Sequence, residues 1–364
     1  MSASFSSRAG GNHAPALRGR RFVAAALLFT SLLVQPHRSA RAEADSATAT
    51  PDDKAAALLR DYRGDVVLIK GKAGAGSGFI INLKGRKFLA SNAHVLAGVR
   101  APTFAPLDRS LLKLKPGAAS VAVGHDIILL EVLEGGTGMP LVESFETEVK
   151  VNDAIAVYGN TGGGDVVTVI KGKLLGLGPD RIEINAAIEH GNSGSPIIHE
   201  RTGKVIGIAT YATTDDLLSG EQQVRRFGYR LDSVKQWQAV DWARFYAEAD
   251  QLEKMQATTT DLKKAFLELN GLNLRRTKAR KFAYETLAIR EALDKFFATV
   301  VDAQSQADAN RARNNLLGAL RGATQPGPTT PKPTFQYEHF RRQSLAEEND
   351  RGELLKGFGR ILQP

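Results

Sequence analysis

Short hydrophobic runs separated by turn-forming residues dominate the chain from about residue 65 to residue 231. The runs are rich in β-branched residues, and Gly, Pro, Asn and Asp divide them at the spacing typical of an all-β sandwich or barrel. Examples are DVVLIKG, GSGFIINL, KFLASNA, DIILLEVL, AIAVYGN and KVIGIATYA. No amphipathic segment of helical length alternates with them, which argues against a parallel α/β fold. The pattern therefore predicts an antiparallel β domain.

From about residue 232 the hydrophobic positions recur every three or four residues, as they do in amphipathic helices. One predicted stripe consists of Phe282, Ile289, Leu293, Phe296 and Val300. A Pro-rich stretch, ATQPGPTTPKP (323–333), then interrupts the pattern, and a polar tail follows that ends in a short helix-like segment. We therefore expect an α-helical C-terminal domain after the β domain.

The first 42 residues have the three parts of an export signal. Arg18, Arg20 and Arg21 give a basic start, residues 22–34 an apolar core, and ARA at 40–42 a cleavage site. An uncleaved membrane anchor is the alternative, but about 13 apolar residues are too few to span a ~30 Å hydrocarbon layer as a helix. We expect cleavage and no stable membrane span afterwards. The arginine pair before the apolar core leaves open whether export follows the Sec or the twin-arginine route.

These patterns divide the chain into five segments. We predict a signal peptide (1–42), a helical lead-in (43–63), a β domain (64–232), a helical domain (233–322), and a Pro-rich linker with a polar tail (323–364). Three roles stay open for the helical domain: forming a homo-oligomer, docking on a protein partner, or gating a cleft.

Most of the net charge belongs to the predicted signal peptide. The full chain carries +9, and residues 1–42 hold six arginines and no acidic residue, so the mature chain carries +3. This value does not imply a nucleic-acid-binding protein. Residues 275–281, RRTKARK, are a basic cluster without interleaved aromatic residues. We interpret the cluster as a solvated helix face or loop, with contact to anionic lipid or nucleic acid as the alternative.

The sequence has no cysteine, so disulfides, thiolate metal sites and cysteine nucleophiles are excluded. An exported chain of this kind fits the bacterial envelope, periplasmic or secreted, better than a disulfide-stapled extracellular module. The mature chain lacks clustered metal ligands, and we expect no metal and no cofactor.

Serine chemistry remains open, and it needs a base, an acid that orients the base, and backbone N–H groups for an oxyanion. The histidines of the mature chain are His94, His125, His190, His199 and His339. His94 follows the apolar strand in FLASNAHVLAG, where a side chain can be held rigidly and still face a cleft. His339 lies in the polar tail, poorly placed for a rigid site. A lone histidine at a strand end is more often structural than catalytic.

Asp126 and a glycine-rich turn supply the other two groups. Asp126 begins the apolar strand DIILLEV, so it is drawn inward and needs hydrogen-bond partners, such as an imidazole N–H or the hydroxyl of Thr210. In GNSGS (191–195), Gly191 can adopt a positive φ, and the N–H groups of Gly191 and Ser193 can then converge on one oxygen. Taken singly, each feature is also a plausible strand start or turn. Their order, His, Asp and then Ser in one β domain, indicates a catalytic triad.

The stretches SNAH, HDIILL and GNSGSP resemble the signatures of the chymotrypsin-like serine proteases, and most of all those of bacterial HtrA-type envelope proteases. The resemblance covers about residues 64–232 and implies two six-stranded antiparallel barrels with a catalytic cleft between them. It also implies that His94 is the general base, Asp126 the orienting acid and Ser193 the nucleophile. The N–H groups of Gly191 and Ser193 would form the oxyanion hole.

The chain departs from the family in three places. Ser195 stands where many members have a second glycine, and Ile128 stands where alanine is frequent. After residue 232 the pattern is helical and lacks a PDZ-type carboxylate-binding loop, so we do not expect PDZ-mediated recognition of substrate C-termini.

Substrate preference follows from the pocket that the resemblance implies. Its predicted residues are Ala187, Ile188, Thr210, Tyr211, Ala212 and Phe227. None of them is charged, so we expect a small or medium apolar side chain at P1, the residue before the scissile bond.

The sequence thus predicts an exported serine endopeptidase that acts on polypeptides through an acyl-enzyme. The alternative is a catalytically idle protease-fold module that acts as a binding scaffold through its helical domain. A third reading, an esterase of α/β-hydrolase type, is disfavoured, because it needs a Gly-x-Ser-x-Gly elbow and the order Ser, Asp, His.

Overall fold

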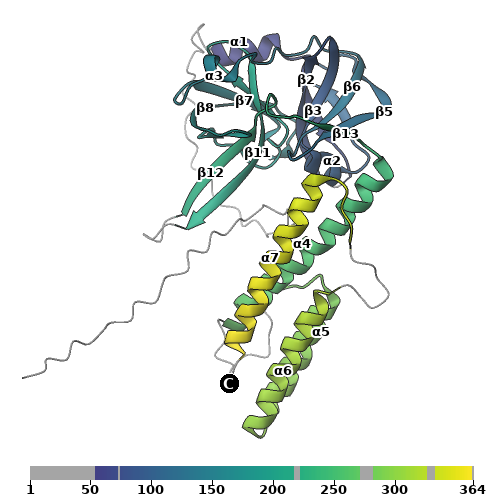
Figure 1. Ribbon diagram of the computed structural model, residues 1–364, viewed down its shortest axis with the longest axis vertical. Coiled ribbons are helices and arrows are strands. Elements are labelled where there is room, and N and C mark those ends of the chain that lie inside the picture. The colour runs from purple at the N-terminus through teal and green to yellow at the C-terminus, as the bar shows by residue number, and fades with distance from the viewer. Residues whose placement is uncertain (1–53, 73, 217–221, 271–281, 326–332, 363–364) are drawn as a thin grey trace, which may run out of the picture.

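The computed structural model describes residues 54–72, 74–216, 222–270, 282–325 and 333–362. A β-rich part lies at one end of the molecule, and long helices extend away from it (Figure 1). The predicted signal peptide and the basic cluster RRTKARK lie outside the described residues. Within the described part of the chain, no helix is both long enough and apolar enough to cross a membrane.

The first half of the β-rich part is a seven-stranded antiparallel sheet with the order β13-β5-β6-β3-β2-β1-β4. Its strands are β1 (Val66–Lys70), β2 (Ala75–Leu83), β3 (Arg86–Ser91), β4 (Thr103–Pro106), β5 (Lys113–Ala122), β6 (Ile128–Glu134) and β13 (Trp237–Ala239). The last of these comes from beyond the second half of the fold and returns to pair with β5.

The second half is a closed antiparallel barrel of six strands, with the order β10-β11-β12-β9-β8-β7. Its strands are β7 (Ala154–Gly159), β8 (Thr168–Leu177), β9 (Arg181–Ile184), β10 (Pro196–His199), β11 (Val205–Asp216) and β12 (Gln222–Tyr229). Pairing of β7 with both β8 and β10 closes the barrel. The ends of β11 and β12 continue as a hairpin that projects from it (Figure 1).

The predicted all-β fold with helices after it is confirmed. The two halves differ in one respect from the implied pair of six-stranded barrels. Only the second is a closed barrel of six strands, whereas the first has seven because the chain passes its edge as β13 on the way to the helices.

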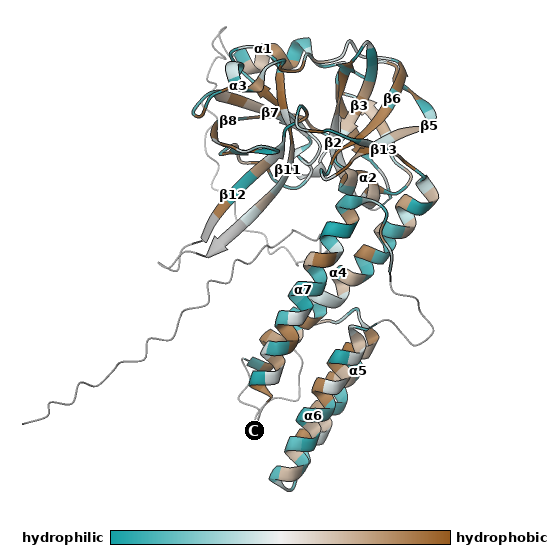
Figure 2. Ribbon diagram, in the orientation of Figure 1, coloured by the Kyte–Doolittle hydropathy of each residue, from teal (hydrophilic) through white to brown (hydrophobic). Residues whose placement is uncertain are grey.

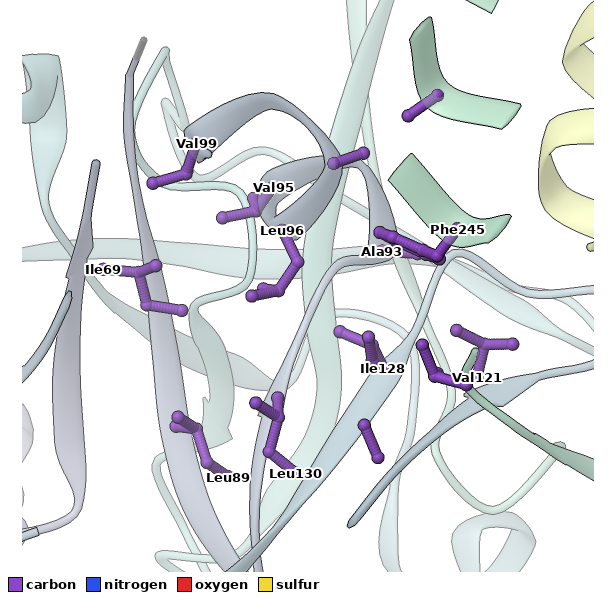
Figure 3. Packing of buried hydrophobic residues seen from close by; sticks show 14 of the residues in the cluster. Ile69, Leu89, Ala93, Val95, Leu96, Val99, Val121, Ile128, Leu130 and Phe245 are labelled. Carbon is purple, nitrogen blue, oxygen red and sulfur yellow. The ribbon is translucent and has the colours of Figure 1, made fainter. Parts of the chain in front are cut away.

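Both faces of the seven-stranded sheet are buried, as the alternation of side chains along β2 shows. Phe79 and Ile81 pack toward the barrel, in a cluster that includes Tyr158 and Ile208. Ile80 points the other way, into a second cluster with Leu96 and Phe245. Figure 3 shows this second cluster, in which residues of helix α2 pack against the sheet. Because successive strand residues face opposite sides, a continuous apolar run marks a strand buried on both faces.

Seven α-helices and one 3₁₀ turn are described. The α-helices are α1 (Lys54–Asp61), α2 (Ala93–Val99), α3 (Phe145–Glu148), α4 (Trp242–Asn270), α5 (Leu287–Val301), α6 (Gln306–Ala323) and α7 (Glu338–Ile361), and the 3₁₀ turn is Thr161–Gly163. Helices α4 and α7 lie side by side, and α5 and α6 form a hairpin at the far end (Figure 1). Hydrophobic and hydrophilic positions alternate along these helices (Figure 2).

Two expectations for the C-terminal region need correction. Phe282 was placed in a helical stripe, but α5 begins at Leu287 and Phe282 is exposed, whereas Leu293 of the same stripe is fully buried. The polar tail with a short helix is instead a helix of 24 residues, α7. Its hydrophobic positions are sparse, and it is held against α4 mainly by Phe340 and Phe358, near its two ends.

Candidate active site

The three residues of the predicted triad come from both halves of the β-rich part. His94 follows β3 and lies in the first turn of α2. Asp126 lies in the connection between β5 and β6, and Ser193 lies in the turn that precedes β10 of the barrel. The nucleophile candidate and the histidine–aspartate pair therefore meet only if the sheet and the barrel pack together.

His94 and Asp126 are in direct contact. Nδ1 of His94 lies 2.5 Å from Oδ2 of Asp126, and the backbone N–H of His94 donates to Oδ1 of Asp126 at 3.0 Å. The carboxylate is buried, and the imidazole is about one-third exposed. Because an ionised carboxylate only accepts hydrogen bonds, Nδ1 carries the proton and Nε2 is left as the basic nitrogen.

The charges of this pair shift both pKa values in the direction of an ion pair. Burial alone lowers the pKa of His94, but the charge of Asp126 and its hydrogen bond outweigh burial and raise the pKa above its usual 6.5. Burial alone raises the pKa of Asp126. Two imidazoles, His339 and His94, together with the hydrogen bonds from His94, hold the pKa of Asp126 well below its usual range.

Ser193 lies close to this pair through Thr210. The hydroxyl of Ser193 donates to the carbonyl oxygen of Thr210 at 3.3 Å. On its other side, Thr210 accepts a hydrogen bond at its hydroxyl from Asn92, whose amide also donates to the carbonyl oxygen of Asp126. A single residue of β11 thus connects the nucleophile candidate to the segment that holds the histidine and the aspartate.

The hydroxyl of Thr210 has a different role from the one that the sequence suggested. It donates to the carbonyl oxygen of Ile208 at 3.1 Å, and so it does not hydrogen-bond to the side chain of Asp126. The reason is a local one, since the carbonyl of Ile208 is two residues away on the same strand. The side chain of Asp126 is contacted by His94 and His339 instead.

The turn that carries Ser193 requires its glycines. Gly191 has a φ of +90°, and a Cβ there would lie 2.0 Å from the carbonyl oxygen of Asn160. Gly194 has a φ of +86°, and a Cβ there would lie 2.1 Å from the carbonyl oxygen of Ser77. Both the conformation and the close backbone approach therefore exclude larger residues.

A buried serine of the sheet, Ser77 of β2, holds this turn in place. The hydroxyl of Ser77 donates to the carbonyl oxygen of Gly191 at 2.9 Å and accepts from the N–H of Asn160 at 3.0 Å. The N–H of Ser77 donates to the carbonyl oxygen of Ser193 at 2.9 Å. Within the described residues, the N–H groups of Gly191 and Ser193 donate to no other protein group, so both are available to a ligand oxygen.

Ser195 is a structural residue of the same turn. Its hydroxyl is completely buried and finds no hydrogen-bond partner among the described residues. A Cβ at Gly159 would lie 2.2 Å from this oxygen, so the hydroxyl occupies space that Gly159 leaves open. Ser195 therefore cannot reach a base or a substrate from this position.

The predicted pocket residues differ in their contacts and exposure. Tyr211 and Phe227 stack with their ring centroids 5.2 Å apart, and Arg181 donates to the hydroxyl of Tyr211 at 2.8 Å. Ile188 is buried, whereas its neighbour Ala187 is exposed. Thr210 is buried and Ala212 is half-buried on the strand that carries Tyr211.

Two residues near the site were missed or misplaced at the level of sequence. Arg226 donates from Nε to the carbonyl oxygen of Ile188 at 3.3 Å, and no carboxylate pairs with its guanidinium within the described part of the chain. His339, which we placed in a polar tail away from any rigid site, lies on α7 with Nε2 3.4 Å from Oδ1 of Asp126. No local sequence signal marks either residue, because each contact joins segments that are far apart in the chain.

The other histidines are not part of this centre. His125 contacts Ser233 at 2.9 Å and packs edge-on against Tyr229, and His190 is exposed. His199 is buried between Thr202 and Asp153. Among the described residues, no group of three or more His, Cys, Asp or Glu side chains is arranged to hold a metal ion.

Residues 76–208 match the family model described as trypsin-like peptidase domain. This is the family that the three motifs predict, and the matched stretch contains all three candidate triad residues.

Proteins named as Do-like and DegP-like proteases are similar to part of the chain. A mitochondrial Do-like protease of Arabidopsis thaliana is 35% identical over 148 residues, which is 37% of this chain and 25% of that protein. A periplasmic DegP-like serine endoprotease of Rhizobium meliloti is 32% identical over 146 residues, 37% of this chain and 27% of that protein. The chain thus spans little more than a quarter of the length of these relatives.

A solved structure is also similar to the chain. It is the crystal structure of the serine endoprotease from Yersinia pestis, with 20% sequence identity and a TM-score of 0.38 over 49% of this chain and 62% of that one.

Proposed function

We propose that this protein is an exported serine endopeptidase that cleaves polypeptides through an acyl-enzyme intermediate. The observation that carries the proposal is the contact between His94 and Asp126, with Nδ1 of the imidazole bound to a buried carboxylate. The match to the trypsin-like peptidase domain supports it, because residues 76–208 include this pair, and so does the similarity to a relative named as a serine endoprotease.

In the proposed reaction, Oγ of Ser193 attacks the carbonyl carbon of the scissile bond while Nε2 of His94 accepts the hydroxyl proton. The carbonyl oxygen becomes an oxyanion, which the N–H groups of Gly191 and Ser193 stabilise. The C–N bond then breaks as His94 returns the proton to the leaving amine. In the second half, water attacks the carbonyl carbon of the acyl-enzyme while His94 accepts its proton. The bond between this carbon and Oγ of Ser193 then breaks, His94 returns the proton to Oγ, and the carboxylic acid product leaves.

Ser193 has to change its hydrogen-bond partner before this reaction. In the free protein its hydroxyl donates to the carbonyl oxygen of Thr210. A rotation about χ1 to another staggered conformation, roughly 120° away, releases the hydroxyl for Nε2 of His94. Such a rotation is inexpensive for a half-buried serine and fits a site that becomes fully aligned when substrate binds.

For substrate preference we propose a small or medium apolar P1 side chain, because the six predicted pocket residues are uncharged. Arg226 gives a reason to test a second class, acidic P1 side chains. Its guanidinium lies against the carbonyl oxygen of Ile188 without a carboxylate partner among the described residues. Peptides that differ only in alanine, valine, glutamate or arginine at P1 separate the two classes, because the ratio of their kcat/KM values measures the preference directly.

Export to the periplasm or beyond is part of the proposal. Its support is the signal-like segment at 1–42 and the similarity to a relative named as periplasmic. Cell fractionation of the full chain, with N-terminal sequencing of the mature protein, tests export and the cleavage site after residue 42.

Labelling with a fluorophosphonate probe tests the activity, since the probe reacts with an activated serine hydroxyl. We expect labelling of the wild type and none of Ser193→Ala. Ser195→Ala is the matched control, because the hydroxyl of Ser195 is buried without a hydrogen-bond partner in the described residues. Its labelling should equal that of the wild type. A folded wild type that is not labelled would support the alternative, an idle protease-fold scaffold that works through its helices.

A further inference from the structure

The C-terminal helix α7 places a second histidine on the candidate catalytic aspartate. Nε2 of His339 lies 3.4 Å from Oδ1 of Asp126, the oxygen that also accepts the backbone N–H of His94, whereas Oδ2 contacts the imidazole of His94. The side chain of His339 is 13% exposed and that of Asp126 is 4% exposed. Within the described residues, Nε2 of His339 has no hydrogen-bond partner of its own. The carboxylate is thus the polar group that this nitrogen faces.

The segment that leads into α7 is anchored to α4. The carboxylate of Glu248 accepts the backbone N–H groups of Gln336 and Tyr337 at 2.9 and 3.1 Å. The hydroxyl of Tyr337 accepts from the N–H of Asp241 at 2.8 Å and also lies 3.1 Å from its carbonyl oxygen. Glu248 is itself buried. The backbone before His339 is therefore fixed by several hydrogen bonds.

The residues after His339 are anchored as well. The ring of Phe340 lies 5.0 Å from that of Phe245, in the hydrophobic cluster that α2 shares with the sheet. Arg342 donates to the carbonyl oxygen of Gly124, two residues before Asp126, at 3.1 Å. Figure 1 shows the start of α7 beside α2, at the edge of the β-rich part. With contacts on both sides, the imidazole of His339 is held in one place.

We propose that His339 is a positioning residue of the catalytic site, and that its Nε2–H donates to Oδ1 of Asp126 and keeps Oδ2 directed at His94. This inference rests on the proposed function. An acceptor-only carboxylate requires the proton on Nε2, so the tautomer follows from the contact. His339 takes the place that the sequence suggested for the hydroxyl of Thr210, which is engaged with Ile208.

Neutral His339 suits this role. Burial, followed by the positive charges of His94 and Arg342, lowers the pKa of His339 despite the opposing charge of Asp126. A neutral imidazole donates one hydrogen bond and leaves the charge of Asp126 in place, whereas an imidazolium would neutralise it. Asp126 needs that charge to stabilise the imidazolium that forms on His94 during the reaction. The C-terminal helix thus contributes to a site whose three candidate triad residues all lie before residue 194.

Two substitutions in the full-length protein test the inference. His339→Phe keeps a ring of similar size without a donor, and His339→Gln keeps an N–H donor near the position of Nε2. We expect His339→Phe to lower kcat about 10-fold or more with little change in KM, because a hydrogen bond to a charged group is lost. His339→Gln should stay within about 3-fold of the wild type.

The pH profile adds a readout that a purely structural residue would not move. The charged or titrating groups that face His339 are Asp126, His94 and Arg342. In His339→Phe the carboxylate of Asp126 loses a hydrogen-bond donor, so its negative charge acts more strongly on the imidazole of His94. The pKa of His94 therefore rises, and the acid limb of kcat/KM moves to higher pH. His339→Gln should keep the limb of the wild type.

Three outcomes separate the possibilities. Unchanged kcat in His339→Phe overturns the positioning role. Equal losses in both variants, accompanied by equal drops in melting temperature, would show that His339 only supports the fold. A wild type that neither cleaves peptides nor reacts with the fluorophosphonate probe contradicts the proposed function itself, and this result is distinct from the other two.

Discussion

At the scale of single residues, contact with an aspartate does not by itself make a histidine a catalytic base. Besides His339, two histidines lie in contact with an aspartate in the described residues, His94 with Asp126 and His199 with Asp153. Burial dominates at His199 and lowers its pKa, whereas at His94 the aspartate prevails and raises it. Only His94 combines partial exposure with a nearby serine, so environment rather than residue type distinguishes the two pairs.

The raised pKa of His94 predicts the acid limb of the activity. His94 must be neutral to accept the proton of Ser193, and a raised pKa means that it becomes charged at a higher pH than an unperturbed imidazole. As the pH falls, kcat/KM should therefore decline with a midpoint above 6.5. Measurement of kcat/KM between pH 5 and 9 checks the prediction. Asp153→Asn, in the second pair, should leave the midpoint unchanged, and a midpoint at or below 6.5 would contradict the assignment.

At the scale of elements, the turn before β10 depends on residues of the neighbouring sheet. Ser77 of β2 holds the carbonyl of Gly191 with its hydroxyl and that of Ser193 with its N–H. The turn is therefore shaped by both halves of the β-rich part, although its residues all belong to one. This arrangement places two backbone N–H groups beside the nucleophile candidate without a partner in the described protein.

Gly191→Ala tests the importance of this turn. The substitution should abolish turnover, because an alanine at a φ of +90° is strained and its Cβ would lie 2.0 Å from the carbonyl oxygen of Asn160. The N–H of residue 191 would then leave its position. Initial rates with a peptide substrate measure the effect, and circular dichroism checks that the variant folds.

Gly98→Ala provides the control for this prediction. Gly98 lies in α2, has no positive φ, and a Cβ there would meet no atom within 4 Å. We expect activity close to that of the wild type. Gly191→Ala with normal turnover would mean that the turn does not form the oxyanion site.

At the scale of the whole molecule, the C-terminal helices are joined to the β-rich part through buried polar contacts as well as hydrophobic ones. Glu248 of α4 is buried and accepts two backbone N–H groups from the segment that leads into α7. The same segment places His339 beside Asp126. A change in how α4 and α7 pack can therefore reach the candidate site directly.

Glu248→Ala should destabilise the protein and lower its activity together. Loss of the Glu248 carboxylate leaves the backbone N–H groups of Gln336 and Tyr337 without an acceptor. We expect this to lower the free energy of unfolding by roughly 2–5 kcal/mol. Amide hydrogen exchange should increase in residues 335–342, and kcat should fall as in His339→Phe. Chemical denaturation and exchange mass spectrometry measure these effects.

The matched control is Lys263→Gln, which removes an exposed ion pair with Asp350 between the same two helices. Such a pair contributes about 0–1 kcal/mol, so little change is expected. Full activity of Glu248→Ala, with exchange in 335–342 increased, would show that the C-terminal helix is dispensable for the site.

Much of this protein is determined by local sequence. The β-branched runs and their turn residues predict the antiparallel fold, because the alternation of side chains and the turn chemistry act over a few residues. His94, Asp126 and Ser193 were identified by short motifs at strand ends. Gly191 was identified in the same way, since a positive φ is a property of one residue and its neighbours.

Only the tertiary structure decided which residues surround these groups. Three features depend on how the chain folds back. They are the seventh strand of the sheet, the hydrogen bond from the hydroxyl of Thr210 to the carbonyl oxygen of Ile208, and the position of the Arg226 guanidinium beside Ile188. His339 is the clearest case, because its polar surroundings in the sequence indicate solvent while its position on α7 places it against a buried carboxylate. Contacts between distant segments depend on how whole helices and strands pack, and a local pattern of residues does not predict that packing.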